Sequence, residues 1–338
     1  MGALIEVADL VKEFRTFNRK EGLLGAVRNL FVREHKIVRA VDRIDFAIPA
    51  GEMVGYIGPN GAGKSTTIKM LTGILMPTSG TIVSNGFRPF ADRTRYTRTI
   101  GVVFGQRTQL WWDIAVVESL RLLKNIYGVS AADYTARLKQ FDDVLELGRY
   151  LSTPVRKLSL GERMRCDVAA ALLHNPPILF LDEPTIGLDI VAKDHIRAFL
   201  KQINREHGTT VLLTTHDLAE IEELCRRLMV IDKGRLLFDG PLDKLKRRLW
   251  RDTAIKFDLK DREQAHRVMT FSLPGVTLER SGELTVRLRF PRESHSTADI
   301  IRKVLNWVEV LDITIEEQSI DEVVKEIYTG NLLEEPVP

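Results

Sequence analysis

The chain has little cysteine and no long hydrophobic run. Its 338 residues include only two cysteines, Cys166 and Cys225, which argues against a disulfide framework and for a reducing compartment. No apolar stretch reaches the roughly 18 residues of a membrane-spanning helix, because the best candidate, 168–181, is interrupted by His174, Asn175 and the prolines that follow. The start MGALIEVADL lacks the basic and apolar regions of a secretory signal. We therefore expect a cytoplasmic protein that reaches a membrane only through a partner.

The chain also has little net charge. A formal charge of +3 and a pI near 8.8 do not by themselves indicate a nucleic-acid partner. Hydrophobic residues at 44% and charged residues at 28% are typical of an ordinary globular protein. A chain of this length is expected to form about two domains.

What the chain does contain is a phosphate-binding loop, GPNGAGKST, at 58–66. The apolar run 53–57 predicts a buried strand before the loop, and 67–71 continue as a helix, which is the setting that the motif requires. Glycines let successive backbone N–H groups turn toward phosphate oxygens, Lys64 reaches the outer phosphates, and the Ser65 hydroxyl suits Mg²⁺. The predicted nucleotide-binding residues are Gly58, Pro59, Asn60, Gly61, Ala62, Gly63, Lys64, Ser65 and Thr66. The alternative, a glycine-rich turn with a chance Lys-Ser pair, does not explain this context.

A second motif, ILFLDEP at 178–184, predicts a short buried strand that ends in two carboxylates. Ligands of parallel sheets gather at that end of the strand. Asp182 is placed to hold Mg²⁺, and Glu183 is placed to polarise the attacking water. Taken alone, the motif is also compatible with a solvated acidic turn before Pro184.

In their order and spacing, five motifs resemble the nucleotide-binding subunits of ABC transporters. They are the phosphate loop, LSLGE at 158–162, ILFLDEP, Leu188-Asp189, and His216 in TTHD. The resemblance covers residues 1–240 and implies an α/β fold. This fold has a P-loop NTPase (RecA-like) core, an antiparallel β subdomain and a helical signature subdomain at about 107–165.

The resemblance implies a catalytic and metal-binding set. Glu183 is the catalytic carboxylate, and His216 is the switch histidine that contacts the γ-phosphate. Gln106, in FGQRTQLWWD, senses Mg²⁺ and couples to the membrane partner. Ser65, Gln106 and Asp182 are the implied metal-binding residues. The implied cofactors are ATP and Mg²⁺.

The resemblance also implies contacts beyond the phosphate loop. Phe14 corresponds to the aromatic residue that stacks on adenine, although an ordinary core phenylalanine fits equally well. Ser159 and Gly161 belong to the signature loop, which closes over ATP held by a second ATP-binding subunit. Asp189 lies in the loop that communicates across that dimer, which is either a homodimer or a heterodimer.

The signature departs from the usual LSGGQ, since Leu160 replaces a glycine and Glu162 a glutamine. Neither change removes the Ser159 hydroxyl or Gly161. Glu162 adds negative charge near a phosphate site, and we expect it to tune affinity or rate.

The segment 17–37 is an insertion, longer than the usual connection between two adjacent strands. Its apolar residues recur at helical spacing among arginines and lysines, which predicts a basic amphipathic helix. Such a helix either lies against a membrane surface or a permease, or packs on its own domain.

Residues 241–330 alternate strand and helix patterns and predict a small C-terminal α+β accessory domain, with a ferredoxin-like order as one arrangement. No catalytic constellation occurs there. The acidic residues 331–338, which include two prolines, are expected to form a flexible tail.

The resemblance therefore implies an ATP-hydrolysing motor subunit that dimerises on ATP and drives a separate integral membrane permease, most simply for export. We expect it at the inner face of the cell membrane as a peripheral subunit, with no nucleic-acid partner. Two alternatives remain open: an ABC-type ATPase that acts on ribosomes or nucleic acid, and a regulatory nucleotide-binding module that does not hydrolyse.

Overall fold

The computed structural model describes residues 2–17, 35–105, 107–249, 252–291, 294–316 and 327. The chain divides into two compact units, Met1–Gly240 and Pro241–Pro338, and each is described by itself.

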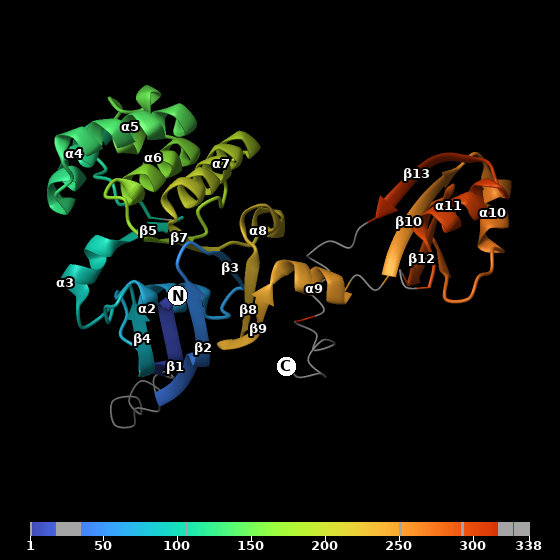
Figure 1. The fold of residues 1–338 in the computed structure, drawn as a ribbon, viewed down its shortest axis with the longest axis horizontal. Coiled ribbons are helices and arrows are strands. Elements are labelled where there is room, and N and C mark those ends of the chain that lie inside the picture. Colours follow the sequence, from blue (N-terminus) through green and yellow to red (C-terminus); the bar gives the residue numbers. More distant parts are fainter. Residues whose placement is uncertain are drawn as a thin grey trace, which may run out of the picture. The chain divides into compact units, whose positions relative to one another are not determined.

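The first unit combines two sheets with a group of helices (Figure 1). Its strands are β1 (Ala3–Phe17), β2 (His35–Pro49), β3 (Met53–Ile57), β4 (Ser79–Ser84), β5 (Ile100–Phe104), β6 (Ile178–Asp182), β7 (Thr210–Thr214), β8 (Arg227–Asp232) and β9 (Arg235–Pro241). Its helices are α2 (Lys64–Leu71), α3 (Arg93–Tyr96), α4 (Val116–Tyr127), α5 (Ala131–Leu145), α6 (Leu160–Leu172), α7 (Ile190–His207) and α8 (Leu218–Leu224).

A six-stranded sheet with the order β5-β6-β7-β3-β8-β9 forms the core of this unit. The pairs β5–β6, β6–β7, β7–β3 and β3–β8 are all parallel. Strands β3 and β7 are buried at every residue, which explains why their sequences are continuous apolar runs without alternation. The carboxyl ends of β3, β6 and β7 therefore meet at one edge, where the predicted motifs follow each strand.

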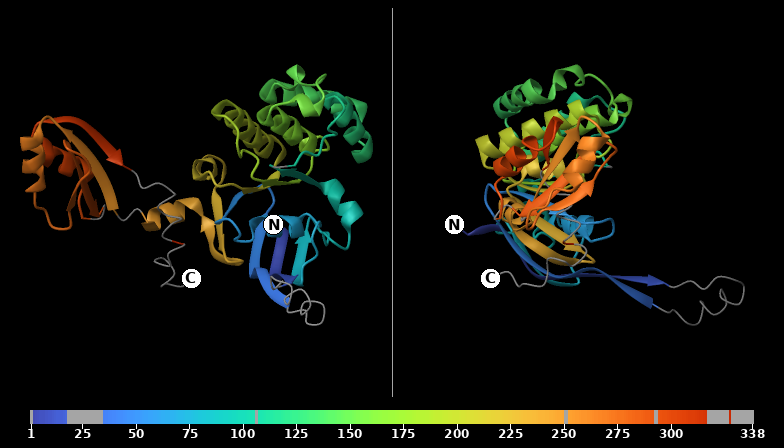
Figure 2. Two further views of the ribbon diagram at one scale, coloured as in Figure 1. Left: turned by 180° about the vertical axis from the view of Figure 1, so that it is seen from behind. Right: turned by 90° about the vertical axis from the view of Figure 1, so that its right-hand side faces the viewer.

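The second sheet is antiparallel, with the order β2-β1-β4. Strands β1 and β2 pair from Ala3 opposite Pro49 to Phe17 opposite His35, and together they run out as a long ribbon (Figure 2). The ends of the predicted insertion 17–37 belong to these strands, because β1 ends at Phe17 and β2 begins at His35. The amphipathic helix predicted within the insertion lies outside the described residues.

Helices α4 to α7 gather on one side of the core sheet (Figure 1). The T-shaped contact between Phe141 of α5 and Phe199 of α7 is part of their packing. Helix α6 runs from Leu160 to Leu172, and its residues from Met164 onward are all buried against their neighbours.

The described part of the second unit contains an antiparallel sheet, against which two of its helices pack. Its elements are α9 (Leu242–Leu249), β10 (Asp252–Leu259), α10 (Arg262–Met269), β11 (Thr277–Arg280), β12 (Thr285–Pro291), α11 (Thr297–Leu305) and β13 (Val310–Glu316). The order β11-β12-β10-β13 is that of a ferredoxin-like split βαβ arrangement. Phe257 and Phe290 of the sheet form its core with Ile300 and Val304 of α11. The predicted C-terminal α+β fold is confirmed.

Within the described ranges, every helix is too short or too polar to cross a membrane.

Candidate nucleotide-binding site

The loop between β3 and α2 is shaped by glycine. Gly63 caps α2 with a φ of 115°, and a Cβ there would lie 2.5 Å from the carbonyl oxygen of Ala40. Only glycine fits this conformation and this space. The turn leaves the positive end of α2 facing the carboxyl edge of the core sheet.

Lys64 is the first residue of α2, and its side chain is 5% exposed. Its Nζ donates to the carbonyl oxygens of Gly58, at 2.5 Å, and of Pro59, at 3.2 Å. Burial lowers the pKa of the Lys64 ammonium, while Glu183 and Asp182 oppose that shift. The ammonium is thus held inside the curve of the loop.

Asp182, at the carboxyl end of β6, accepts hydrogen bonds from two hydroxyls. Ser65 Oγ donates to Asp182 Oδ1 over 3.2 Å, and Thr214 Oγ1 donates to the same oxygen over 2.7 Å. The three residues come from α2, β6 and β7, so the parallel order of the sheet is what brings them together.

Glu183 has a φ of 55°, which is unusual for a residue other than glycine. Its backbone N–H donates to the carbonyl oxygen of Thr214, at 3.0 Å, which holds the strained conformation in place. Its carboxylate oxygen Oε1 lies 2.5 Å from Nε2 of His216. The Glu183 side chain therefore points away from β6 and toward the loop that follows β7.

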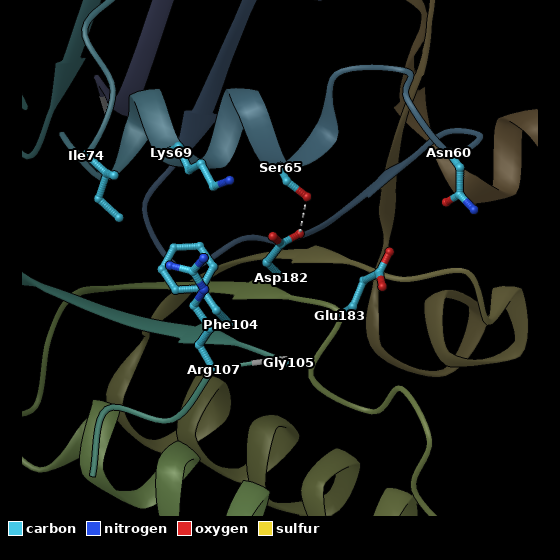
Figure 3. A pocket seen from close by; sticks show the side chains of 9 residues that line it. All are labelled: Asn60, Ser65, Lys69, Ile74, Phe104, Gly105, Arg107, Asp182 and Glu183. Atoms are coloured by element: carbon cyan, nitrogen blue, oxygen red, sulfur yellow. Dashed lines mark hydrogen bonds between the residues drawn. The ribbon is translucent and has the colours of Figure 1, made fainter. Parts of the chain in front are cut away.

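A cavity of about 400 Å³ lies between α2 and the ends of β5 and β6. Figure 3 shows Ser65 and Lys69 on the face of α2 that points toward Asp182 and Phe104. The residues lining the cavity are Asn60, Ser65, Lys69, Ile74, Phe104, Gly105, Arg107, Asp182 and Glu183. Gly105 is required here because a Cβ would lie 2.0 Å from the carbonyl oxygen of Glu183.

A second cavity of about 260 Å³ borders the other side of Glu183. It is lined by Glu183, Thr185, Ile186, Gly187, Lys193, Thr215, His216 and Asp217. Glu183 is shared by both cavities, so its carboxylate lies between the phosphate loop and the His216 loop.

Comparison with known proteins identifies the family. A family model described as ABC transporter matches residues 41–186. The daunorubicin/doxorubicin resistance ATP-binding protein DrrA of Streptomyces peucetius is 35% identical over 299 residues, which covers 86% of this chain and 88% of that protein. The chain belongs to the ABC transporter family. Its ATP-binding, ATP-hydrolysing character, predicted from the motifs, is confirmed.

Two further relatives of this ABC transporter subunit are informative. The bacitracin transport ATP-binding protein BcrA of Bacillus licheniformis is 30% identical over 300 residues, covering 87% of this chain and 94% of that protein. A solved dimeric structure of an ATP-binding cassette, in a post-hydrolysis state with ADP and Pi, is 27% identical with a TM-score of 0.59. It covers 70% of this chain and 98% of that one. The predicted fold class is confirmed.

The structure does not bring all predicted site residues to the two cavities. Ser159 is the N-cap of α6, and Asp189 is the N-cap of α7, where its side chain accepts from the N–H of Ala192 at 2.8 Å. Phe14 lies on β1 with Lys12 Nζ 5.3 Å from its ring centre. Neither cavity includes these residues or Gly161 in its lining. Gln106 lies outside the described residues.

The signature serine forms a capping box with Glu162. Glu162 Oε2 accepts the backbone N–H of Ser159 at 2.8 Å, and Ser159 Oγ accepts the backbone N–H of Glu162 at 3.3 Å. Glu162 thus stabilises the start of α6 by a local interaction that a glutamine would also make. It also places a carboxylate beside the Ser159 hydroxyl.

Sequence reasoning missed Thr214, which is fully buried and touches both acidic residues of the site. A signal for it was present, because Thr214 ends the apolar run VLLT directly before the His216 loop. A hydroxyl at the end of a central parallel strand can orient the carboxylates that end the neighbouring strand.

Sequence reasoning also missed Asp167, an acidic residue on α6 that is 3% exposed. Burial raises its pKa to about 6, while the hydrogen bonds from Thr108 and Gln109 and the charge of Arg163 oppose the shift. Because the folded state holds the proton more tightly than the unfolded chain, this group makes the protein less stable as pH rises from about 4 to about 6.

We therefore expect Asp167→Asn to alter the pH dependence of stability. From pH 5 to pH 7, the unfolding free energy of the wild type should fall by about 1 kcal/mol relative to that of the variant. Urea unfolding at the two pH values measures this difference. A constant difference between the two proteins would show that Asp167 keeps an ordinary pKa.

Proposed function

We propose that this chain is the ATP-hydrolysing motor of an exporter, and that it works as one of a pair of ATP-binding subunits on a separate membrane permease. One observation carries the proposal. Asp182 and Glu183 leave β6 in different directions, toward Ser65 of the phosphate loop at 3.2 Å and toward His216 at 2.5 Å. Asp182 can therefore bind the metal ion while Glu183 activates the water, and ATP hydrolysis requires both tasks.

The protein groups have separate tasks in hydrolysis. The backbone N–H groups of the loop and Lys64 bind the phosphates and stabilise charge on the transferred phosphoryl group. Glu183 accepts a hydrogen bond from the attacking water and orients it, because its carboxylate faces both cavities. His216 fixes the carboxylate rotamer and contacts the γ-phosphate.

The donor set of the site suits Mg²⁺. A serine hydroxyl and a carboxylate are hard oxygen ligands, and Thr214 orients the carboxylate. No group of three or more His, Cys, Asp or Glu side chains in the described part of the chain is arranged to hold a metal. Mg²⁺ would thus be held by Ser65 and Asp182 together with phosphate oxygens and water, with Gln106 as a further ligand. When bound, it neutralises charge on the phosphates.

The positions of the remaining site residues support the pairing of two subunits. Ser159 and Gly161 lie at the amino end of α6 and line neither cavity, and we assign them to a nucleotide bound by another chain. Helix α6 offers that nucleotide a positive end and a serine hydroxyl. Asp189 caps the amino end of α7, and Phe14, which is an exposed aromatic residue of β1, would stack on adenine.

The permease partner is supported by an exposed aromatic pair. Trp111 and Trp112 are 42% and 48% exposed, on the segment that follows Gln106. Large exposed aromatic side chains are typical of interfaces. The relatives named for drug resistance and bacitracin transport favour export. The protein would then lie at the inner face of the cell membrane.

The test is ATPase activity of the purified chain with and without detergent-extracted membranes from the cell of origin. We expect stimulation of the wild type, loss of stimulation in Trp112→Ala, and no phosphate release by Glu183→Gln in either setting. Activity that membranes never change, together with salt-sensitive binding to RNA or DNA, would instead favour a non-transport ATPase.

We expect Glu162→Gln to bind ATP more tightly in the paired state. Glutamine keeps the hydrogen bond to the Ser159 N–H but removes the negative charge beside the Ser159 hydroxyl, which in this proposal would meet the γ-phosphate of the partner's ATP, so the repulsion disappears. The ATP concentration for half-maximal activity should fall by roughly threefold to tenfold. Steady-state kinetics measure it, with Glu118→Gln on the exposed face of α4 as the matched charge control. If both variants lowered this ATP concentration equally, the charge of Glu162 would have no specific effect on ATP binding.

A further inference from the structure

The segment that follows Gln106 is bonded to helix α6 by a buried acid. Asp167 Oδ1 accepts a hydrogen bond from Thr108 Oγ1 at 2.8 Å and another from the Gln109 backbone N–H at 3.0 Å. Gln109 Nε2 in turn donates to the Asp167 carbonyl oxygen at 2.9 Å. The Leu110 N–H donates to Thr108 Oγ1 at 3.1 Å. One buried side chain therefore organises three consecutive residues of this segment.

A second contact joins the same segment to α6, one helical turn before Asp167. The Arg163 guanidinium lies 5.4 Å from the ring centre of Trp112. Arg163 and Asp167 are four residues apart on α6, so they share one face of the helix. Thr108 and Trp112 are likewise four residues apart, and the segment lies along that face.

The turn before α6 adds a third attachment. Arg156 donates its backbone N–H to the Trp112 carbonyl oxygen at 3.0 Å, and its guanidinium pairs with Asp113 at 3.1 Å. The exposed ion pair contributes little by itself. The backbone bond, however, fixes Trp112 against the residues that lead into Ser159.

A buried carboxylate is costly unless its hydrogen bonds are made in one arrangement. Asp167 lies among buried apolar neighbours such as Val168, so an apolar residue would serve simple packing better. Its presence specifies the position of Thr108 and Gln109 relative to α6. Ser159 caps helix α6 about two turns before Asp167, and the helix is a rigid element.

We propose that Asp167 and Arg163 fasten the segment Thr108–Trp112 to helix α6, so that the segment after Gln106 and the Ser159–Gly161 loop move as one piece. This inference rests on the proposed function, in which Gln106 and Ser159 act on ATP bound by different chains. Asp167 is then a positioning residue. It sets how readily the Ser159 loop closes on nucleotide and transmits a displacement of Trp112 by the permease.

The test compares Asp167→Ala with Val168→Ala, a matched control that removes a fully buried side chain from the same helix without touching Thr108. Both substitutions are made in a Glu183→Gln background, and ATP-dependent dimerisation is followed by light scattering well below the melting temperature. We expect Asp167→Ala to raise the ATP concentration for half-dimerisation at least fivefold. Val168→Ala should leave it within twofold, and Asp167→Asn, which keeps the acceptor oxygen, should restore most of the loss. Equal shifts in the Ala variants, or no shift in Asp167→Ala, would overturn the inference.

A second measurement does not depend on dimerisation. Hydrogen exchange of the peptide amides in 108–112 should quicken at least tenfold in Asp167→Ala and remain unchanged in Val168→Ala. If exchange is unchanged in both, the attachment itself is wrong. If exchange behaves as expected but the Glu183→Gln parent never dimerises on ATP, the proposed function fails while the attachment stands.

Discussion

Replacing Glu183 by glutamine should abolish steady-state ATP hydrolysis, lowering kcat by about 10³-fold. The amide keeps the shape of the side chain and its place beside His216, but it no longer accepts a proton or draws the attacking water toward the γ-phosphate. Because Glu183 takes no part in holding the phosphate loop, nucleotide affinity should change by less than about threefold. Phosphate release and equilibrium binding of a fluorescent ATP analogue measure the two quantities.

Glu222, on helix α8, supplies the matched control. Glu222→Gln makes the same change from carboxylate to amide, at a residue that lines neither cavity. It should leave kcat within about twofold. If Glu183→Gln retained more than about a tenth of wild-type kcat, another group would be the base and the division of roles between Asp182 and Glu183 would be wrong.

Replacing Lys64 by alanine should weaken ATP binding by about 100-fold. The ammonium is buried inside the loop and bonded to the carbonyl oxygens of Gly58 and Pro59, so it is already positioned for phosphate oxygens. Loss of a charge-assisted hydrogen bond to a buried site costs about 2–3 kcal/mol, which corresponds to this change in affinity. Isothermal titration with ATP and Mg²⁺ measures it.

Lys69 lies on the same helix and lines the cavity beside Ser65, but its side chain is exposed. Lys69→Ala should weaken ATP binding by less than about fivefold, because an exposed charge is screened by solvent. Equal losses in the two variants would mean that the cavity attracts ATP by its general charge and not through Lys64.

Much of the nucleotide site was predictable because its motifs are local. A glycine-rich loop between a strand and a helix has few alternative conformations, and a strand that ends in DEP places both carboxylates at the edge of the sheet. Thr214 and Asp167 were harder to predict, because each acts through contacts with residues more than 30 positions away. A threonine in a strand or an aspartate in a helix carries no signal until the partner is known.

The start of β2 in the β1–β2 ribbon was hard to predict for a different reason. Residues 35–37 follow a charged run, so their sequence does not resemble a buried strand. They are nevertheless strand residues because each pairs with β1, from His35 opposite Phe17 to Ile37 opposite Arg15. Pairing in an exposed ribbon depends on the partner strand more than on side-chain pattern.

The most direct test of the proposed motor is the mass of Glu183→Gln in solution, measured by light scattering with Mg²⁺ and either ATP or ADP. A site completed by a second chain predicts a particle of twice 38.4 kDa with ATP and of 38.4 kDa with ADP. Adding Gly161→Asp to the same chain should abolish the ATP-dependent dimer while ATP binding persists. A variant that binds ATP but stays at 38.4 kDa at every protein concentration would contradict the account.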